Sequence, residues 1–400
     1  MSARRTGPGG EEGWVRRSAR GRVEPFHVME LLKAANERAV THGDVITLCA
    51  GQPSTAAPRP AREAAARALA DGAVLGYTDA VGIPALREAI AAHHATSYGL
   101  TVDPAQVVVT TGSSAAFTAL FLAAFDVGDV VVMARPGYPA YRNTLGALGC
   151  SVVEIGCGSS VRFQPTVGLL EDVSAELGSP PAGLIVASPA NPTGTVIDAA
   201  ELAAIARWCE AHGTLLISDE IYHGVTYGAS VASAWETSRS SVLVGSMSKY
   251  FSMTGWRVGW LVLPRPLVRP VELLVGNLNI CAPAICQVAA VAAFSAEAQS
   301  ELRGHVARYA ANRDLLLRRA PELGITRMAP PDGAFYLYTD VSHLTDDSMA
   351  WTRQVLADTG VALTPGADFD TARGHRYVRM SFAGGTDEVD EAMTRLAAYV

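Results

Sequence analysis

Between about residues 80 and 250, short runs rich in β-forming residues alternate with longer amphipathic stretches. This alternation is typical of βαβ units, in which helices join the strands of a largely parallel sheet and cover its faces. Each strand-like run meets Gly, Pro, Ser or Asp within two residues of its end. The expected strands are 106–111, 130–134, 152–155, 183–187, 214–218 and 242–245. The sequence therefore predicts an α/β fold, with a large domain built on a mostly parallel sheet flanked by helices.

The intervening stretches are expected to form helices at 84–97, 114–125 and 199–212, with glycine following the first and last of these. From about residue 295 the pattern changes to a long Arg-rich helix, a strand at 334–338, a helix at 349–359 and a closing helix from residue 386. A chain of 400 residues exceeds the usual size of one core. We expect an N-terminal arm (1–45) that joins the small domain, a large cofactor-binding domain (46–290), and a small α+β C-terminal domain (291–400).

The composition excludes some classes of function. The net charge is −7, and no long Lys/Arg run occurs beyond the first two dozen residues, which argues against a nucleic-acid surface. No run approaches the ~18 apolar residues that a membrane-spanning helix needs. Six dispersed cysteines form no CxxC pair, and no apolar stretch follows the arginines near the N-terminus, so we expect a cytoplasmic protein with a mobile N-terminal arm.

A lysine stands directly after the expected strand 242–245, in Ser246-Met247-Ser248-Lys249. Alone, Lys249 would be interpreted as a surface lysine; in a functional interpretation it is a nucleophilic amine that forms an imine. Eight residues on, Arg257 offers a guanidinium that holds a phosphate dianion with help from Ser246. A phosphate anchor beside such a lysine implies pyridoxal phosphate. The turn at 111–114 opens a helix and provides a second half of the anchor, although alone it is compatible with a plain N-cap.

Polar residues follow two further strands. Asp219 comes after the run 215–217, where its carboxylate suits a protonated pyridine nitrogen; alone it could be an exposed turn aspartate. Tyr222 lies three residues later and is expected to reach the phenolic oxygen of the cofactor. Asn191 begins Asn-Pro-Thr-Gly after the strand 183–187, a sequence that also suits an ordinary turn. In the functional interpretation its amide donates to the same oxygen.

These residues resemble those of the class I/II aminotransferases, the aspartate aminotransferase-like family of fold-type-I pyridoxal phosphate enzymes. The resemblance runs from about residue 51 to residue 382. Its motifs occur in one order along the chain, and they are Gly51-Gln52-Pro53, Tyr77 with Gly82 ahead of Leu86-Arg87, Thr111-Gly112-Ser113, Pro136-Gly137-Tyr138-Pro139, Asn191-Pro192-Thr193-Gly194, Asp219-Glu220-Ile221-Tyr222, Ser246-Met247-Ser248-Lys249, Gly255-Trp256-Arg257-Val258-Gly259 and Arg379-Met380-Ser381-Phe382.

The resemblance implies a role for each matching residue. Lys249 is then the cofactor lysine and the catalytic base, Asp219 the pyridinium partner, and Tyr138 the ring that stacks on the cofactor. The remaining cofactor contacts implied are Asn191 and Tyr222 at the ring oxygen and Ser113, Ser114, Ser246 and Arg257 at the phosphate. Tyr77 would come from the neighbouring subunit, which implies a homodimer with shared active sites. Arg379, with Gly51 and Asn191, would bind the substrate.

The resemblance also implies the reaction, in which an L-amino acid gives its amino group to a 2-oxo acid with ping-pong kinetics. Aspartate enzymes of the nearest subgroup tend to carry a lysine where this chain has Ser114, so a neutral donor such as alanine or valine is favoured, with aspartate possible. The nine histidines show no metal-binding spacing, and no metal is expected. Partners are therefore expected to be the two small substrates and a second copy of the chain.

Two alternatives remain open at this point. A lyase or synthase on the same fold would use the same cofactor residues, because the same carbanion can eliminate a β- or γ-substituent. A non-catalytic, ligand-sensing protein is the alternative of another class, since a fold alone never establishes activity. The intact Lys249 weighs against the sensor.

Overall fold

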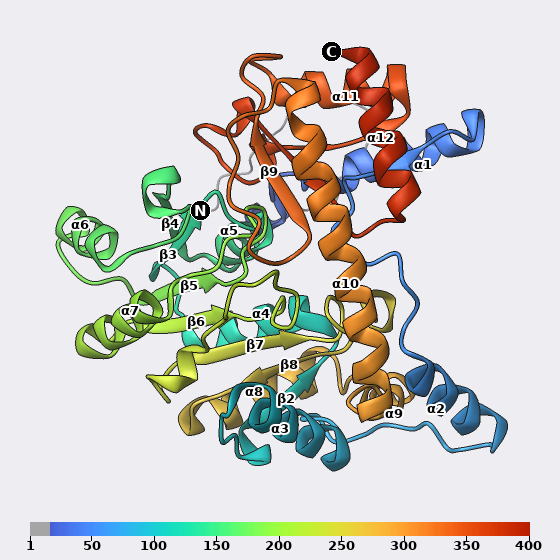
Figure 1. The fold of residues 1–400 in the computed structure, drawn as a ribbon. Coiled ribbons are helices and arrows are strands. Elements are labelled where there is room, and N and C mark those ends of the chain that lie inside the picture. The colour runs from blue at the N-terminus through green and yellow to red at the C-terminus, as the bar shows by residue number, and fades with distance from the viewer. Residues whose placement is uncertain (1–16) are drawn as a thin grey trace.

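The computed structural model describes residues 17–400, and its centre is a seven-stranded mixed sheet (Figure 1). In spatial order the strands are β2 (Val107–Thr110), β8 (Gly259–Val262), β7 (Val242–Ser246), β6 (Leu215–Asp219), β5 (Gly183–Ala187), β3 (Val130–Arg135) and β4 (Ser151–Gly156). The five strands from β7 to β4 are parallel. The six strands expected for this sheet are present with ends shifted by at most one residue, the strand expected at 334–338 forms at 336–340 outside it, and the predicted α/β class is confirmed.

Strand β8 was not among the expected strands, and it is the strand that makes the sheet mixed. It pairs antiparallel with β7 on one side and with β2 on the other. Residues 259–262 directly follow the arginine motif, and a run of four apolar residues carries too little period to separate a strand from a loop. Its strand conformation depends on pairing with both neighbours, of which β2 lies more than 100 residues earlier in the sequence.

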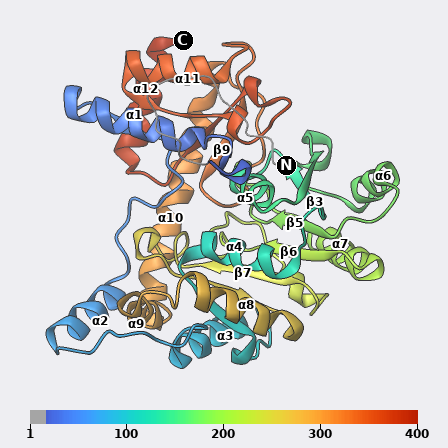
Figure 2. The same cartoon turned by 180° about the vertical axis from the view of Figure 1, so that it is seen from behind.

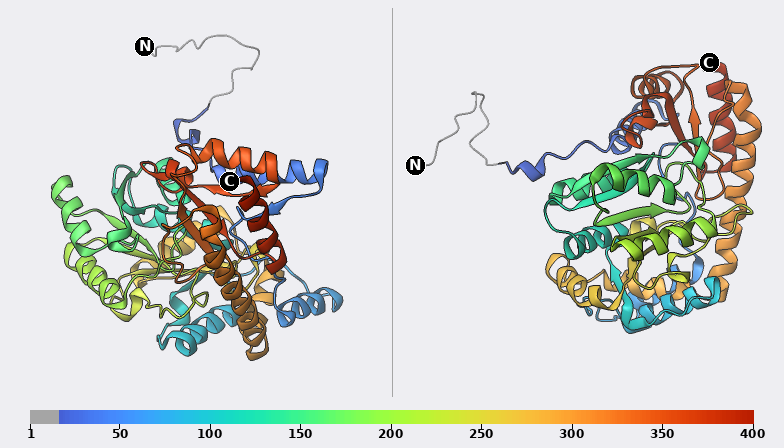
Figure 3. Two further views of the ribbon diagram at one scale, coloured as in Figure 1. Left: turned by 45° about the horizontal axis from the view of Figure 1, so that its top comes forward. Right: turned by 90° about the vertical axis from the view of Figure 1, so that its left-hand side faces the viewer.

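The sheet is buried on both faces, and successive strand residues point to opposite sides. In β2, Val107 and Val109 pack into one apolar cluster while Val108 packs into the other. Strands covered on both faces read as continuous apolar runs, as these do. Helices cover both faces, as the right-hand view of Figure 3 shows. One face carries α4 (Gly112–Ala124), α5 (Pro139–Leu148) and α8 (Arg265–Leu278), and the other side carries α3 (Pro84–Tyr98), α6 (Val167–Leu177), α7 (Ala199–His212) and α9 (Ala284–Ala293).

The C-terminal part of the chain forms a second layer at the top of Figure 1. Its sheet has the order β11-β12-β9, and a two-stranded parallel pair joins β1 to β10. The elements are β9 (Tyr336–Asp340), β10 (Val361–Ala362), β11 (Thr364–Pro365), β12 (Tyr377–Ser381), α10 (Ala296–Arg319), α11 (Ser348–Thr359) and α12 (Thr386–Tyr399). The helix α10 runs beside both layers, and α2 (Arg59–Ala70) packs against α9 at the far end (Figure 2).

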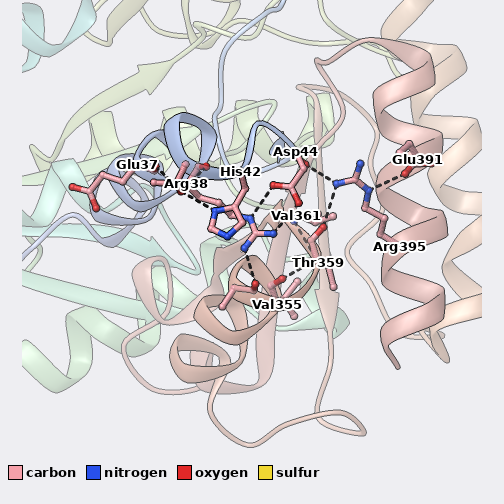
Figure 4. Close-up of polar contacts among 11 residues, drawn as sticks. Glu37, Arg38, His42, Asp44, Val355, Thr359, Val361, Glu391 and Arg395 are labelled. Atoms are coloured by element: carbon pink, nitrogen blue, oxygen red, sulfur yellow. Dashed lines mark hydrogen bonds and ion pairs between the residues drawn. The ribbon is translucent and has the colours of Figure 1, made fainter.

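The N-terminal helix α1 (His27–His42) packs on this C-terminal layer, next to β1 (Ile46–Thr47) (Figure 4). The Arg38 guanidinium donates to both carboxylate oxygens of Asp44 at 3.1 and 2.8 Å. This hydrogen bonding lowers the pKa of Asp44. Arg395 on α12 donates to the Asp44 carbonyl oxygen at 2.6 Å and to that of Thr359 at 3.2 Å. The segment that precedes the large sheet is thereby tied to the last helix.

We propose the division at about residues 45 and 290 that the sequence suggests, since α1 and the elements from α10 onward share one layer. The expected N-terminal arm falls partly on residues 1–16, which lie outside the described residues. Among residues 17–400, no helix combines the length and the apolar character needed to cross a membrane.

Candidate active site

Four of the parallel strands end at one edge of the sheet, and the loops that follow them carry the polar residues singled out in the sequence. Asp219 is the last residue of β6, and Lys249 lies three residues beyond β7. Asn191 follows β5, and Tyr138 follows β3 and precedes α5. Ligands of open α/β sheets gather at this carboxyl edge. The fold therefore brings together residues that are more than 100 positions apart.

The Lys249 side chain is partly buried, and its amine donates to the carbonyl oxygen of Gly51 at 2.7 Å. Its nitrogen also lies 5.7 Å from the centre of the Tyr222 ring. Burial, aided by the positive charges of Arg379 and Arg257, lowers the pKa of Lys249 to about 8. More of the amine is therefore neutral near pH 8 than in an ordinary lysine, and a nucleophile or base requires this neutral form.

Asp219 is a buried carboxylate with partners on both oxygens. The Tyr141 hydroxyl donates a short hydrogen bond to Oδ2, and the backbone N–H of Ile221 donates to Oδ1 at 3.1 Å. Burial raises the pKa of Asp219 to about 6, although these two hydrogen bonds and the nearby Lys249 oppose the rise. The carboxylate is thus mostly ionised at pH 7, and the hydrogen bond from Tyr141 fixes its orientation.

The N-terminus of α4 faces the Arg257 guanidinium. Gly112 has φ +74°, and a Cβ atom there would collide with the Arg257 Nη2 atom. Arg257 itself has φ 52° and donates to the carbonyl oxygen of Thr254 at 2.9 Å. Because no side chain caps the first turn of α4, its free N–H groups and the guanidinium converge on one spot. This arrangement suits an anion.

We call the spot between the first turn of α4 and the Arg257 guanidinium the anion cup. Three serines belong to the segments that form it or lead into it. Ser246 is buried at the end of β7, and its hydroxyl accepts from the Ser248 N–H at 3.1 Å. Ser113 is partly buried in the first turn of α4, whereas Ser114 is exposed. A Cβ atom at Gly259 would approach the Ser113 nitrogen to 2.6 Å, so β8 and the first turn of α4 are in close contact.

Arg379 on β12 is 3% exposed and reaches the site from the C-terminal layer. Its Nη1 donates to the Asn191 side-chain oxygen at 2.7 Å and its Nη2 to the Cys49 carbonyl oxygen at 2.7 Å. The guanidinium carbon lies 4.3 Å from the ring centre of Tyr336 and 4.7 Å from that of Phe369. Two aromatic faces therefore hold the plane of the guanidinium.

Three further residues of the site, Tyr141, Tyr336 and Phe369, were not predicted from the sequence. Tyr141 lies one helical turn after Tyr138, and this spacing could have indicated a shared face. Tyr336 carries no local signal, since it sits on β9 at a position that reads as core. Its ring is fully buried, and its hydroxyl lies 2.5 Å from that of Tyr222. Tyr77, which was expected to reach the site of a neighbouring subunit, is 84% exposed in this single chain.

A family model described as aminotransferase class I and II matches residues 43–396. The chain belongs to the class I and II aminotransferases. The aminotransferase is 56% identical over 383 residues to a valine–pyruvate aminotransferase of Mycobacterium tuberculosis, covering 95% of this chain and 97% of that one. The family resemblance inferred from the motifs is therefore confirmed.

Solved structures of other aminotransferases have the same fold as this chain. A crystal structure of an aminotransferase from Mycobacterium tuberculosis superposes with a TM-score of 0.93 at 55% identity, covering 96% of this chain and 99% of that one. The aspartate aminotransferase from Thermus thermophilus with maleate gives a TM-score of 0.89 at 32% identity, covering 96% and 100%. The aminotransferase is thus an enzyme that moves an amino group from an amino acid to a 2-oxo acid, and the sensor alternative is set aside.

Proposed function

We propose that this aminotransferase uses pyridoxal 5'-phosphate and transfers the amino group of valine to pyruvate. The observation that carries the proposal is the Lys249 amine, whose pKa burial lowers to about 8 while Asp219 and Arg379 lie close by. The substrate pair is supported by the 56% identical relative that is named a valine–pyruvate aminotransferase. Alanine is a second neutral donor of the same kind, and aspartate is the charged alternative.

The chain's residues fit the polar ends of such a cofactor. A side chain at Gly112 would occupy the position of the Arg257 guanidinium. Because residue 112 is a glycine, the guanidinium lies against the first turn of α4, where both can bind a phosphate. The buried carboxylate of Asp219 suits a protonated ring nitrogen, because an opposite charge there would offset the cost of burying the carboxylate. The other residues proposed to hold the cofactor are Ser113, Ser114, Ser246, Tyr138, Asn191, Tyr222 and, from a second subunit, Tyr77.

When bound, the cofactor withdraws electrons from the Cα–H bond of the donor. The residues of the chain supply the remaining functions, which are charge balance, substrate binding and proton transfer. Asp219 holds negative charge at the buried end of the site. Arg379 binds the donor carboxylate as a fork and so fixes the direction of the Cα–H bond. The Lys249 amine accepts the Cα proton as the general base and later returns a proton.

The proposed neutral donor follows from charge. The Arg379 guanidinium binds one carboxylate, and we assign to it the α-carboxylate that every amino acid donor has. Ser114 carries no charge at the position where related aspartate enzymes have a lysine. A second carboxylate in the donor would therefore lack one counter-charge, whereas an isopropyl group needs none.

We propose a homodimer with shared sites and a cytoplasmic location. Tyr77 is 84% exposed, and Val74 and Leu69 beside it are 96% and 64% exposed, an apolar group suited to a second copy. All six cysteines are free, which suits a reducing compartment. A mixture of Lys249→Ala and Tyr77→Ala subunits tests the sharing, because one site of each mixed dimer regains both native residues and activity should return. Mixtures that stay as inactive as their parents would contradict it.

The decisive experiment follows the visible absorbance of the purified protein loaded with pyridoxal phosphate. Valine, alanine, glutamate and aspartate are added one at a time without an acceptor. We expect valine to bleach the visible band and pyruvate to restore it. Ammonia released from a single amino acid, with no need for pyruvate, would instead establish the lyase. A protein that forms no visible band would contradict the cofactor.

A further inference from the structure

A cavity of about 490 Å³ lies between the sheet and the C-terminal layer, separate from the Lys249 amine. Its floor comes from Arg135 at the end of β3 and from residues 156–159 after β4. Its other wall comes from Tyr338 on β9 and Tyr377 at the start of β12. No residue of the proposed cofactor or substrate set lines it. The volume exceeds what one or two waters occupy and is in the range of small-ligand pockets.

The charged side chains that line the cavity are Arg135, Arg327, Arg373, Arg376, Asp340 and Asp370. Two of the arginines are matched by the two carboxylates. Arg135 lies 3.2 Å from Asp370, and Arg327 lies 3.0 Å from Asp340. Asp370 also accepts from two backbone N–H groups at 2.9 Å each, so its charge is already well compensated.

Within residues 17–400, Arg373 and Arg376 form no contact ion pair with a carboxylate, although Arg376 is close enough to Asp340 for its charge to help lower the Asp340 pKa. Neither guanidinium makes a hydrogen bond or an ion pair within residues 17–400. Arg376 is partly buried and Arg373 exposed, which places one at the wall and one toward the mouth. The cavity therefore holds a surplus of two positive charges, and paired guanidinium groups favour oxyanions because they donate in a planar fork.

Tyr338 supplies a second and independent indication of a ligand. Tyr338 lines the cavity and is 1% exposed, and within residues 17–400 its buried hydroxyl has no hydrogen-bond partner. The ring is held by stacking on Tyr377, with ring centres 4.9 Å apart and planes at 7°. Burial holds the pKa of Tyr338 well above its ordinary value, so the hydroxyl keeps its proton. A buried donor without an acceptor is unfavourable unless a ligand accepts from it.

The chemistry available is binding and not covalent reaction. The nucleophile that lines the cavity is Cys157, and burial raises the pKa of its thiol to about 12. The thiol is therefore protonated and unreactive at neutral pH.

We propose that this cavity binds a small multivalent oxyanion, of phosphate or polycarboxylate type, between the sheet and the C-terminal layer. The anion accepts from Arg373, Arg376 and Tyr338. These three groups belong to the C-terminal layer, and Arg135 of β3 lines the same cavity from the large sheet. An anion bound there stabilises the folded protein by mass action. This binding is independent of which amino acid the active site uses.

The test is isothermal titration calorimetry on the protein loaded with pyridoxal phosphate, with sodium pyrophosphate in one series and sodium citrate in another at fixed ionic strength. We expect saturable binding of one anion per chain, and the preferred anion assigns the chemistry. The double variant Arg373→Gln/Arg376→Gln should bind roughly tenfold or more weakly. The matched control is the double variant Arg207→Gln/Arg318→Gln, which removes two positive charges from exposed positions of α7 and α10 outside the cavity.

Two further variants separate this site from the active site and guard against misfolding. Arg379→Ala, which alters the substrate position, should leave the anion affinity unchanged. Tyr338→Phe removes one hydroxyl that has no partner, so the fold should persist while affinity falls about fivefold. The proposal is overturned if neither anion binds saturably to the wild-type protein, or if the double variant and Tyr338→Phe both bind as it does.

Discussion

The hydroxyl groups of Tyr222 and Tyr336 lie 2.5 Å apart, although the two residues are separated by 114 positions in the sequence. Their rings meet edge to face with centres 5.7 Å apart. Burial raises the pKa of both phenols, so both keep their protons at neutral pH. If Tyr336 donates to Tyr222, the Tyr222 proton is free for the ring oxygen of a cofactor. We propose that Tyr336 positions Tyr222 in this way.

Tyr336→Phe is expected to weaken that alignment without removing a direct cofactor contact. The lost hydrogen bond is worth about 1 kcal/mol, which corresponds to a change of about fivefold in cofactor affinity. The pH at which the visible band of the bound cofactor changes should shift as well. The control is Tyr309→Phe, which removes a buried hydroxyl bonded to Thr55 at 3.0 Å. Equal behaviour of the two variants would show that Tyr336 has only a structural role.

Lys249→Ala should abolish the visible band of the cofactor and lower the transfer rate by roughly 10³-fold or more, because it removes both the covalent attachment and the base. Absorbance and a valine-to-pyruvate assay measure the two effects. The control is Lys33→Ala, which removes an exposed lysine of α1 and should change neither. A Lys249→Ala variant with wild-type turnover would refute the assignment.

The rate of reconstitution with pyridoxal phosphate should rise with pH. Attack by Lys249 needs the neutral amine, and the lowered pKa of about 8 places its deprotonation below that of an ordinary lysine. The neutral fraction is then roughly a tenth at pH 7 and nine tenths at pH 9. Stopped-flow absorbance from pH 6 to 10 should give a midpoint near 8. A midpoint near the ordinary lysine value of 10.5 would show that the site does not perturb the amine.

Arg379→Lys should raise the KM for valine and leave the absorbance of the bound cofactor in place. An ammonium cannot reproduce the two parallel hydrogen bonds of a guanidinium. Loss of one charge-assisted bond, about 1.5–3 kcal/mol, corresponds to a roughly 10- to 150-fold fall in kcat/KM. Arg318→Lys, at an exposed position on α10, is the control. An unchanged KM would remove Arg379 from substrate binding.

Gly112→Ala should impair cofactor binding and destabilise the fold. Its φ of +74° costs an alanine about 1 kcal/mol, and the new Cβ atom would displace the Arg257 guanidinium from the anion cup. Thermal unfolding and cofactor titration measure the two effects. The control is Gly304→Ala, an exposed helical position with open space around it, where alanine should stabilise slightly. A Gly112→Ala variant that binds the cofactor with wild-type affinity would contradict the proposed role of the anion cup in holding the phosphate.

The regular parts of the sheet could be read from the sequence because their signals are local. The runs 183–187 and 199–212 coincide with β5 and α7 at both ends, since a continuous apolar run and a capped amphipathic stretch each mark their own limits. Strand β8 was missed for the converse reason. Its four residues become a strand by pairing between β7, which lies a short loop earlier in the chain, and β2, which lies more than 100 residues earlier.

The same distinction applies to the active site. Lys249, Asp219, Asn191 and Arg257 stand in recognisable order along the chain, because each motif must follow its own strand or turn, and the family could be identified from them. The partners that orient these groups belong to no motif. Tyr336 reaches Tyr222 and Arg379 only because β9 and β12 pack over the end of the large sheet. Burial, pKa shifts and the arginine-lined cavity arise only once the two layers are in contact, since they depend on which groups lose water together.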